Sequence, residues 1–209
     1  MKNVLKIIKK PLINALVGML LFAIPFFIHI NFYIDMFLVI ISYAGLTYAW
    51  CTAIFYILEE FTQYKDHKKH LKISNIASGC TATIMIILFS FPNLLPNYTG
   101  NESGYVKEHT IYVTTNHECD YCEISKETRK RAVFLYNITH DKNVQVVDVS
   151  NDTNLGRSLN TKVKIFGSIV KVKNNEVKQI PYSRGTSDKK PLKTPTSYIY
   201  KSIYDIEKS

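Results

Sequence analysis

Two cysteines, Cys119 and Cys122, enclose two residues in the segment Cys-Asp-Tyr-Cys, and this spacing can support thiol–disulfide chemistry. In that chemistry a thiolate attacks a disulfide and forms a mixed disulfide, which a second nearby thiol then resolves. Two intervening residues bring both sulfurs into one helical turn when the pair begins a helix. The helix N-terminus directs unpaired N–H groups at the first sulfur and favours its thiolate. The sequence therefore predicts Cys119 as the attacking cysteine and Cys122 as the resolving one.

The residues around the pair form its predicted catalytic environment: His117, Glu118, Asp120 and Tyr121. The carboxylates of Glu118 and Asp120 oppose a thiolate on Cys119, whereas a protonated His117 favours it. The sequence does not give the balance of these opposing effects, so the direction of electron flow stays open.

The elements that must position the cysteines follow from the hydrophobic pattern around them. Residues 109–115 alternate and are rich in β-branched and aromatic types, which predicts a strand leading into the cysteines. Apolar residues at helical spacing predict a helix over residues 119–137. The other predicted elements are a strand over 143–149, a loop with a short helix over 151–160, a hairpin of 166–173 and 176–180 with its turn at Asn174–Asn175, a polar loop over 181–195, and a strand pair or helix over 197–206.

This order, βαβ followed by ββ, resembles the thioredoxin fold over residues 108–180. The resemblance implies an α/β thioredoxin-like domain over residues 109–209, whose only cofactor is a redox-active disulfide between Cys119 and Cys122. A single CxxC on a membrane-anchored chain is also similar to the thioredoxin-like accessory proteins of bacteriocin systems. That similarity implies an exported thiol- or disulfide-containing protein or peptide as substrate, and a membrane redox partner.

Three positions depart from the thioredoxin pattern. Glu118 stands where the family has Trp, and Val113 stands where it has a buried acid. The family's cis-proline falls on Gly167 if the hairpin over 166–180 is the family hairpin, which the segment lengths favour. In a second alignment, Pro195 takes that place at the entry of a later strand.

Two other roles for the cysteines stay open. An oxidising compartment also suits a static disulfide, and the domain would then be a binding or assembly module of an export, conjugation or immunity system. A metal site would need His117 beside both cysteines, with His109 or His140 as the fourth ligand. The chain has no second CxxC to support such a site, and we expect no metal.

The N-terminal half has the composition of a membrane region. Residues 1–100 hold only 8 of the 26 basic and 4 of the 17 acidic residues. Three apolar stretches reach the length of about 20 residues that a bilayer requires: 11–30, 36–58 and 73–95. We therefore predict a membrane domain over residues 1–95 with three transmembrane helices and a linker over residues 96–108. Cys51 and Cys80, at similar predicted depths, fit either a membrane thiol pair or small packing residues.

Basic residues in short loops predict the orientation. Four lysines precede residue 11, four more lie between residues 65 and 72, and none lies between residues 29 and 35. We therefore expect a multi-pass protein of the cell membrane with a cytoplasmic N-terminus and an extracytoplasmic C-terminal domain. The lipid bilayer is an expected partner. Nucleic acid is not, because the charges of the second half are interspersed rather than gathered in a basic stripe.

Overall fold

The computed structural model describes the chain except residues 1, 28–30, 63–65, 102, 141–142, 166, 174–175, 183–185, 188–189 and 192. The turn predicted at Asn174–Asn175 therefore lies outside the described residues. The chain forms two compact units, Met1–Ser90 and Phe91–Ser209, and each is described by itself.

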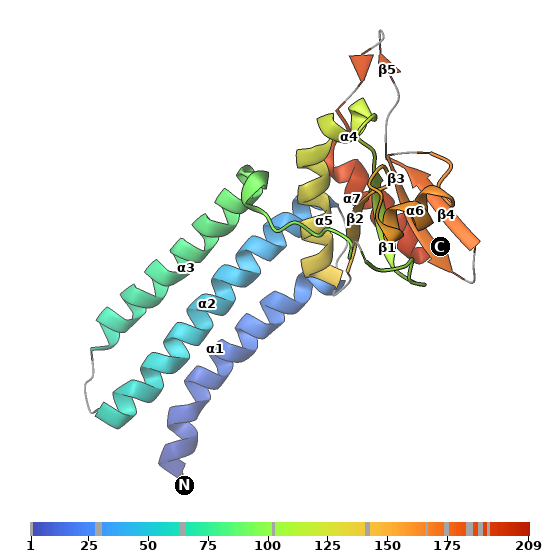
Figure 1. Ribbon diagram of the computed structural model, residues 1–209. Helices are drawn as coiled ribbons and strands as arrows, with labels where there is room; N and C mark the ends of the chain where they lie inside the picture. The colour runs from blue at the N-terminus through green and yellow to red at the C-terminus, as the bar shows by residue number, and fades with distance from the viewer. Residues whose placement is uncertain are drawn as a thin grey trace. The chain divides into compact units, whose positions relative to one another are not determined.

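The first unit consists of three long helices, α1 (Lys2–Phe27), α2 (Phe32–Thr62) and α3 (His67–Ser90). Helix α2 packs against both of the others (Figure 1). The backbones of α1 and α2 approach closely because small residues lie between them: a Cβ atom on Gly45 would fall 2.8 Å from Cδ1 of Leu21. Polar groups also join the helices, since the Ser78 hydroxyl donates to the carbonyl oxygen of Ala44 (2.9 Å).

Two of these helices, α2 and α3, are long and apolar enough to span a membrane, so the prediction of three spans is wrong in number for the described residues. Helix α1, in contrast, carries four lysines among its first nine residues and Asn14 a turn later, so its described part is less uniformly apolar than that of α2. The span predicted over 73–95 is displaced too. Helix α3 ends at Ser90 because Pro92 disfavours the helical conformation at Phe91, whose φ is −112° and ψ 82°.

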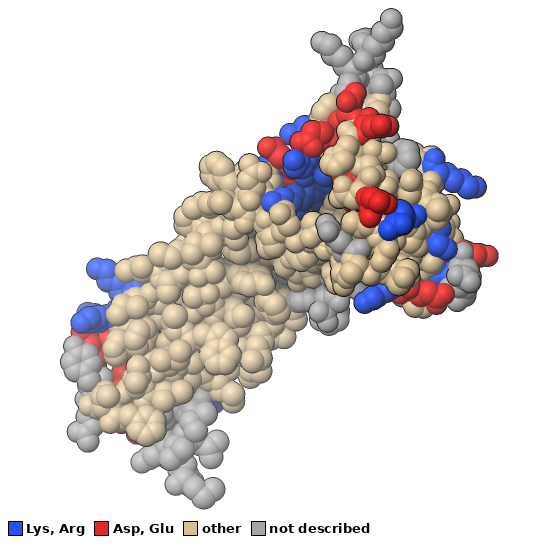
Figure 2. All heavy atoms as spheres, viewed as in Figure 1, with Lys and Arg blue, Asp and Glu red and all other residues tan. Residues whose placement is uncertain are grey.

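The surface of the helical unit is apolar along its length. Figure 2 shows the viewed face of the unit without Lys, Arg, Asp or Glu except toward the end where α2 meets α3. Large apolar side chains of α2 and α3 are exposed at many positions, among them Phe37, Trp50, Ile54, Ile76 and Ile84. Such a surface suits lipid rather than water.

The second unit is an α/β structure built on a mixed four-stranded sheet of order β2-β1-β3-β4. Strand β1 pairs in parallel with β2 and antiparallel with β3, which forms a hairpin with β4. The strands are β1 (Ile111–Thr115), β2 (Gln145–Asp148), β3 (Ser168–Lys173) and β4 (Glu176–Pro181), with a separate small hairpin of β5 (Thr186–Ser187) and β6 (Lys190–Pro191). The helices are η1 (Pro92–Leu94), α4 (Asp120–Ile124), α5 (Lys126–His140), α6 (Asn154–Asn160) and α7 (Thr196–Lys208).

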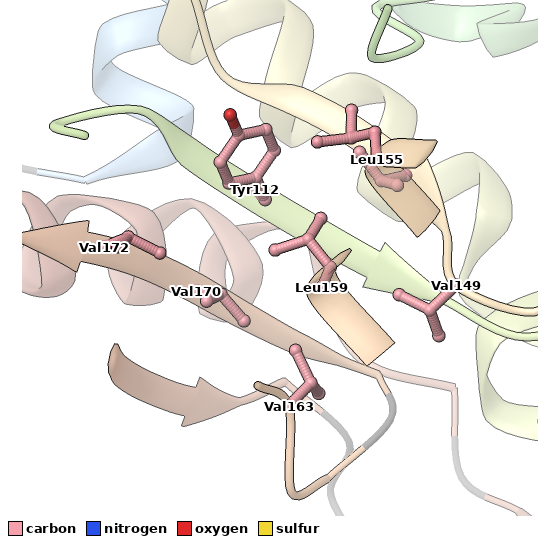
Figure 3. Close-up of a cluster of buried hydrophobic side chains, with 8 residues drawn as sticks. Tyr112, Val149, Leu155, Leu159, Val163, Val170 and Val172 are labelled. Atoms are coloured by element: carbon pink, nitrogen blue, oxygen red, sulfur yellow. The ribbon is translucent and has the colours of Figure 1, made fainter. Parts of the chain in front are cut away.

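Helices cover both faces of this sheet. Leu155 and Leu159 of α6 pack in one core cluster with Tyr112 of β1 and Val170 of β3 (Figure 3). Helices α5 and α7 pack against each other, and α7 also contacts β3 and β4. All five residues of β1 are buried, as a central strand between two helical layers requires.

The structure decides one open prediction and corrects another. Residues 197–206, predicted as a strand pair or a helix, lie within helix α7. Part of the segment predicted as a linker joins the sheet beside β2: the Val146 amide donates to Tyr98 O (2.6 Å), and the Gly100 amide donates to Val146 O (3.0 Å).

Candidate functional site

Cys119 and Cys122 form a disulfide where β1 passes into α4, with their Cα atoms 5.2 Å apart. Strand β1 ends at Thr115, a short turn follows, and Cys119 is the N-cap residue of α4. The predicted disulfide is therefore confirmed, as is its place between a strand and a helix.

Hydrogen bonds from backbone amides fix the geometry of the turn between β1 and α4. The Asn116 side-chain oxygen accepts from the amide of Glu118 (2.9 Å), and the Asn116 carbonyl accepts from the amide of Cys119 (3.1 Å). The Cys122 amide donates to the Cys119 carbonyl (2.8 Å) and also lies 3.2 Å from the Cys119 sulfur, which accepts from it. The same N–H group is placed to stabilise a thiolate on Cys119 after reduction.

The two cysteines differ in accessibility. Cys119 is half-buried, whereas Cys122 is only 3% exposed. An incoming disulfide can therefore reach the first cysteine more easily than the second. The division into an attacking thiol and a resolving thiol stays a prediction.

Gly167 lies against the disulfide. A Cβ atom at this position would be 3.5 Å from Sγ of Cys122 and 3.7 Å from Sγ of Cys119. Gly167 directly precedes β3 and has a φ of +70°, a conformation that favours glycine. Pro195 instead caps the N-terminus of helix α7, whereas the second alignment requires it to enter a strand. No cis peptide bond occurs among the described residues.

The other predicted neighbours lie around the turn and differ in their contacts. His117 reaches the end of β2, where its Nε2 lies 3.1 Å from a carboxylate oxygen of Asp148. Glu118 and Asp120 are exposed and adjoin Cys119 along the chain, and Tyr121 is half-buried in α4.

The metal-site alternative gains no support from these positions. Within the described part of the chain, no three His, Cys, Asp or Glu side chains are grouped so that they could hold a metal ion. His109 precedes β1, at the end of that strand opposite to the cysteines. His140 ends α5, and its ring stacks on Tyr136 with ring centroids 4.0 Å apart.

A buried network behind the cysteines was missed by the sequence reasoning. Arg129 of α5 is 8% exposed, and its Nη1 donates to the carbonyl oxygen of Cys122 (2.8 Å) and to the hydroxyl of Tyr182 (3.2 Å). The Tyr182 hydroxyl in turn donates to the carbonyl oxygen of Thr114 (3.0 Å). Burial raises the pKa of the Tyr182 phenol, and the Arg129 guanidinium opposes that rise.

One signal in the sequence could have revealed part of this network. Arg129 follows Cys122 by seven residues, two helical turns, so both lie on the same face of the predicted helix. The helical pattern instead grouped Arg129 with the exposed charged residues around it. Tyr182 lay in a segment predicted as a polar loop, but it directly follows β4 and is completely buried.

Comparisons with protein-family models, with curated proteins and with solved structures give no match. The protein is therefore characterised by its fold and its candidate site. It is an α/β unit with a CxxC disulfide between a strand and a helix, preceded in the chain by two helices that could span a membrane.

Proposed function

We propose that this protein is a membrane-anchored thiol–disulfide oxidoreductase with a thioredoxin-like domain. The observation that carries the proposal is the unequal burial of the disulfide pair at the N-terminus of α4. Cys119 is partly accessible and accepts a hydrogen bond from the Cys122 amide, while Cys122 is buried behind it. A static disulfide has no need of one accessible sulfur beside a preformed N–H donor.

The reaction of the reduced pair would proceed in two balanced steps. The Cys119 thiolate attacks one sulfur of a substrate disulfide, forms a mixed disulfide and releases the other substrate sulfur as a thiolate. Cys122, deprotonated, then attacks Sγ of Cys119, which restores the Cys119–Cys122 disulfide and releases the second substrate thiolate. Two electrons pass from the protein to the substrate, and the reverse sequence oxidises a substrate dithiol.

The arrangement of the sheet supports the thioredoxin-like part of the proposal. The unit follows the order β1, α4–α5, β2, α6, β3, β4, which is the βαβ-plus-hairpin order of the resemblance. Gly167 occupies the position before the hairpin, and a Cβ atom there would lie 3.5 and 3.7 Å from the two sulfurs, as expected of the residue in the cis-proline place. Its backbone would flank an extended substrate segment beside Cys119.

The charges of the helical unit support an extracytoplasmic position for the α/β unit. Lys68, Lys69 and Lys72 lie at the start of α3, and Phe91 follows the opposite end of that helix. Lys10 of α1 lies 6.0 Å from the ring centroid of Tyr56, near the end of α2. The basic residues of both segments thus lie at one end of the unit, which the positive-inside rule assigns to the cytoplasm. The substrates would then be exported proteins or peptides, as the resemblance to bacteriocin accessory proteins implies.

A non-enzymatic assembly module is the second candidate. Its support is the set of departures from the thioredoxin pattern: Glu118 before the first cysteine, the fully buried Val113 on β1, and Gly167 in place of a proline. In that case the disulfide would only fix the turn between β1 and α4.

Trapping of the mixed disulfide separates the two candidates. The Cys122→Ser variant of the full chain, with Cys51 and Cys80 replaced by Ala, should accumulate covalent adducts through Cys119 because the resolving thiol is absent. The Cys119→Ser variant in the same background is the matched control and should form few. A Cys122→Ser variant without adducts on oxidised peptides or on exported proteins would favour the assembly module.

A further inference from the structure

A cavity of about 130 Å³ lies beside α5, within the α/β unit. Its basic side is formed by residues of α5. Its other side is formed by β2 and by residues 98–99, which pair with that strand. The lining residues that matter here are Lys126, Arg129, Lys130, Tyr98, Thr99 and Val146. A water molecule takes about 30 Å³ in the liquid, so the cavity has room for a small polar group and its water.

Arg129 lines this cavity and has hydrogen-bond donors that the described residues do not use. A guanidinium has five N–H donors, and the two on Nη1 serve the Cys122 carbonyl and the Tyr182 hydroxyl. For Nε and Nη2, the described residues supply neither a hydrogen-bond acceptor nor a carboxylate in ion-pair distance. Within the described part of the chain, the fully buried polar atoms without a partner do not include Nε or Nη2, so both keep some contact with solvent. A guanidinium that is 8% exposed and has no opposite charge from these residues beside it favours an anion at this contact.

The surroundings of Arg129 add positive charge. Figure 2 shows basic side chains gathered over α5, next to acidic ones over α4. Lys126 and Lys130 line the cavity on either side of Arg129 in the sequence. Glu127 is the acidic residue of the lining, and its carboxylate pairs with Lys193 (3.4 Å). Lys126 is paired with Glu123 (3.1 Å) in an exposed contact that salt and solvent weaken.

We propose that this cavity is a binding site for a carboxylate, held side-on by Nε and Nη2 of Arg129. Two parallel N–H···O bonds from one guanidinium match the two oxygens of a carboxylate. The lysines of the rim attract the anion, and the ligand supplies the charge that the buried guanidinium lacks. The carboxylate belongs either to a free small acid or to an Asp or Glu side chain of a bound peptide.

Binding of a carboxylate would change the reactivity of the cysteines through Arg129. This consequence rests on the proposed redox function. The same guanidinium donates to the carbonyl oxygen of Cys122. A carboxylate on its opposite edge cancels the positive charge that favours a thiolate nearby. Reduced Cys119 should therefore react more slowly when the cavity is occupied.

The test uses the full chain, oxidised, in nanodiscs of phosphatidylcholine, with binding read by saturation-transfer NMR. The probes are acetate against acetamide, and a cysteine-free peptide Gly-Gly-Asp-Gly-Gly, blocked at both ends, against its Asn analogue. We expect signal from both carboxylates and none from the two amides. Arg129→Met should weaken carboxylate binding by about tenfold or more, the value of a paired, charge-assisted contact. Arg157→Met is the matched control, because Arg157 is an exposed residue of α6 paired with Asp152, and it should leave binding unchanged.

The two sources of the carboxylate are distinguished by affinity. Tighter binding of the Asp peptide than of acetate would identify a substrate side chain, and equal binding would identify a free acid. Equal signals from carboxylates and amides in the wild-type protein would overturn the proposal, whether or not Arg129→Met folds. Because these measurements need no turnover, they stand apart from the trapping of the mixed disulfide that tests the proposed function.

Discussion

Gly167 places bare backbone against Cys122, because it has no side chain in the space next to the sulfur and holds a φ of +70°. A Cβ atom at this position would lie in van der Waals contact with both sulfurs, 3.5 Å from Cys122 and 3.7 Å from Cys119. A larger side chain at residue 167 would therefore adjoin the disulfide directly. Residue 167 therefore affects both the surroundings of the two sulfurs and the backbone conformation directly before β3.

Substitution Gly167→Ala should destabilise the α/β unit by about 1–2 kcal/mol, the cost of a left-handed conformation in an L-residue. The added methyl group would also touch both sulfurs and slow the attack of a bulky disulfide on Cys119. Thermal unfolding followed by near-ultraviolet circular dichroism measures the first effect, with a fall in Tm of several degrees. An unchanged Tm would show that residue 167 does not need this conformation.

Substitution Arg129→Met should slow alkylation of reduced Cys119 at neutral pH by about tenfold. A unit charge at about 10 Å is worth ~1.7 kcal/mol at an effective dielectric constant of about 20, slightly more than tenfold in thiolate population. The variant also leaves Cys122 O and the Tyr182 hydroxyl without their donor, which should cost about 1–3 kcal/mol of stability. Rates are compared under reducing conditions with those of Arg157→Met. Equal rates in both variants would remove Arg129 from any role at the cysteines.

The stability of the α/β unit should fall at alkaline pH. Burial raises the pKa of Tyr182, and burial with the Glu207 hydrogen bond raises that of Tyr136, above the ordinary value of 10. Above pH 10 the unfolded state therefore loses these protons first, and the stability present below pH 10 is lost as the pH rises. Each tyrosine contributes a slope of up to about 1.4 kcal/mol per pH unit.

The control for this pH dependence is Tyr182→Phe, which removes one ionisable group but keeps the ring. Urea unfolding between pH 9 and pH 11 should give a shallower loss of stability in the variant than in the wild type. Identical slopes would mean that Tyr182 titrates alike in the folded and unfolded states.

The two cysteines of the pair should differ in reactivity after reduction. Cys119 is partly accessible and Cys122 is buried, so a maleimide should modify Cys119 at least about tenfold faster, since the thiolate needs access to react. Mass spectrometry of peptides after brief alkylation gives the ratio, with Cys51 and Cys80 replaced by Ala. Faster modification of Cys122 would reverse the assigned roles.

Single cysteines should report the orientation in the membrane. Asn160→Cys places an exposed thiol at the end of α6, and Lys68→Cys places one near the start of α3. In intact cells, an impermeant maleimide should label the first and not the second, with native Cys51 and Cys80 replaced by Ala. Labelling at Lys68→Cys alone would place the α/β unit in the cytoplasm.

The sequence predicted the site better than the limits of the helices. The alternation of residues 109–115 and the spacing of the cysteines are local features of the sequence. The first appears in the structure as strand β1, and the second as a disulfide at the N-terminus of α4. Span lengths failed because an apolar run does not reveal where a helix stops. Helix α3 ends at Ser90, shortly before Pro92, so the apolar run predicted over 73–95 continues past the helix.

The buried network was unpredictable for a different reason. Arg129 and Tyr182 are 53 residues apart in the chain, and their hydrogen bond exists only once β4 and α5 have packed in one unit. A charged residue in an amphipathic pattern is ordinarily assigned to the solvent face. The bridge between Thr99 and Val146 could not be predicted for a similar reason, because a single bridge leaves no periodic pattern in the sequence.

The redox midpoint of Cys119 and Cys122 in the full chain tests the central claim most directly. The protein is equilibrated in graded glutathione buffers, and the thiol state of the pair is read as a mass shift after alkylation. An oxidoreductase predicts a midpoint between about −120 and −270 mV, the range of known thiol–disulfide enzymes. A pair that stays oxidised to below about −300 mV would contradict the claim, because structural disulfides lie there.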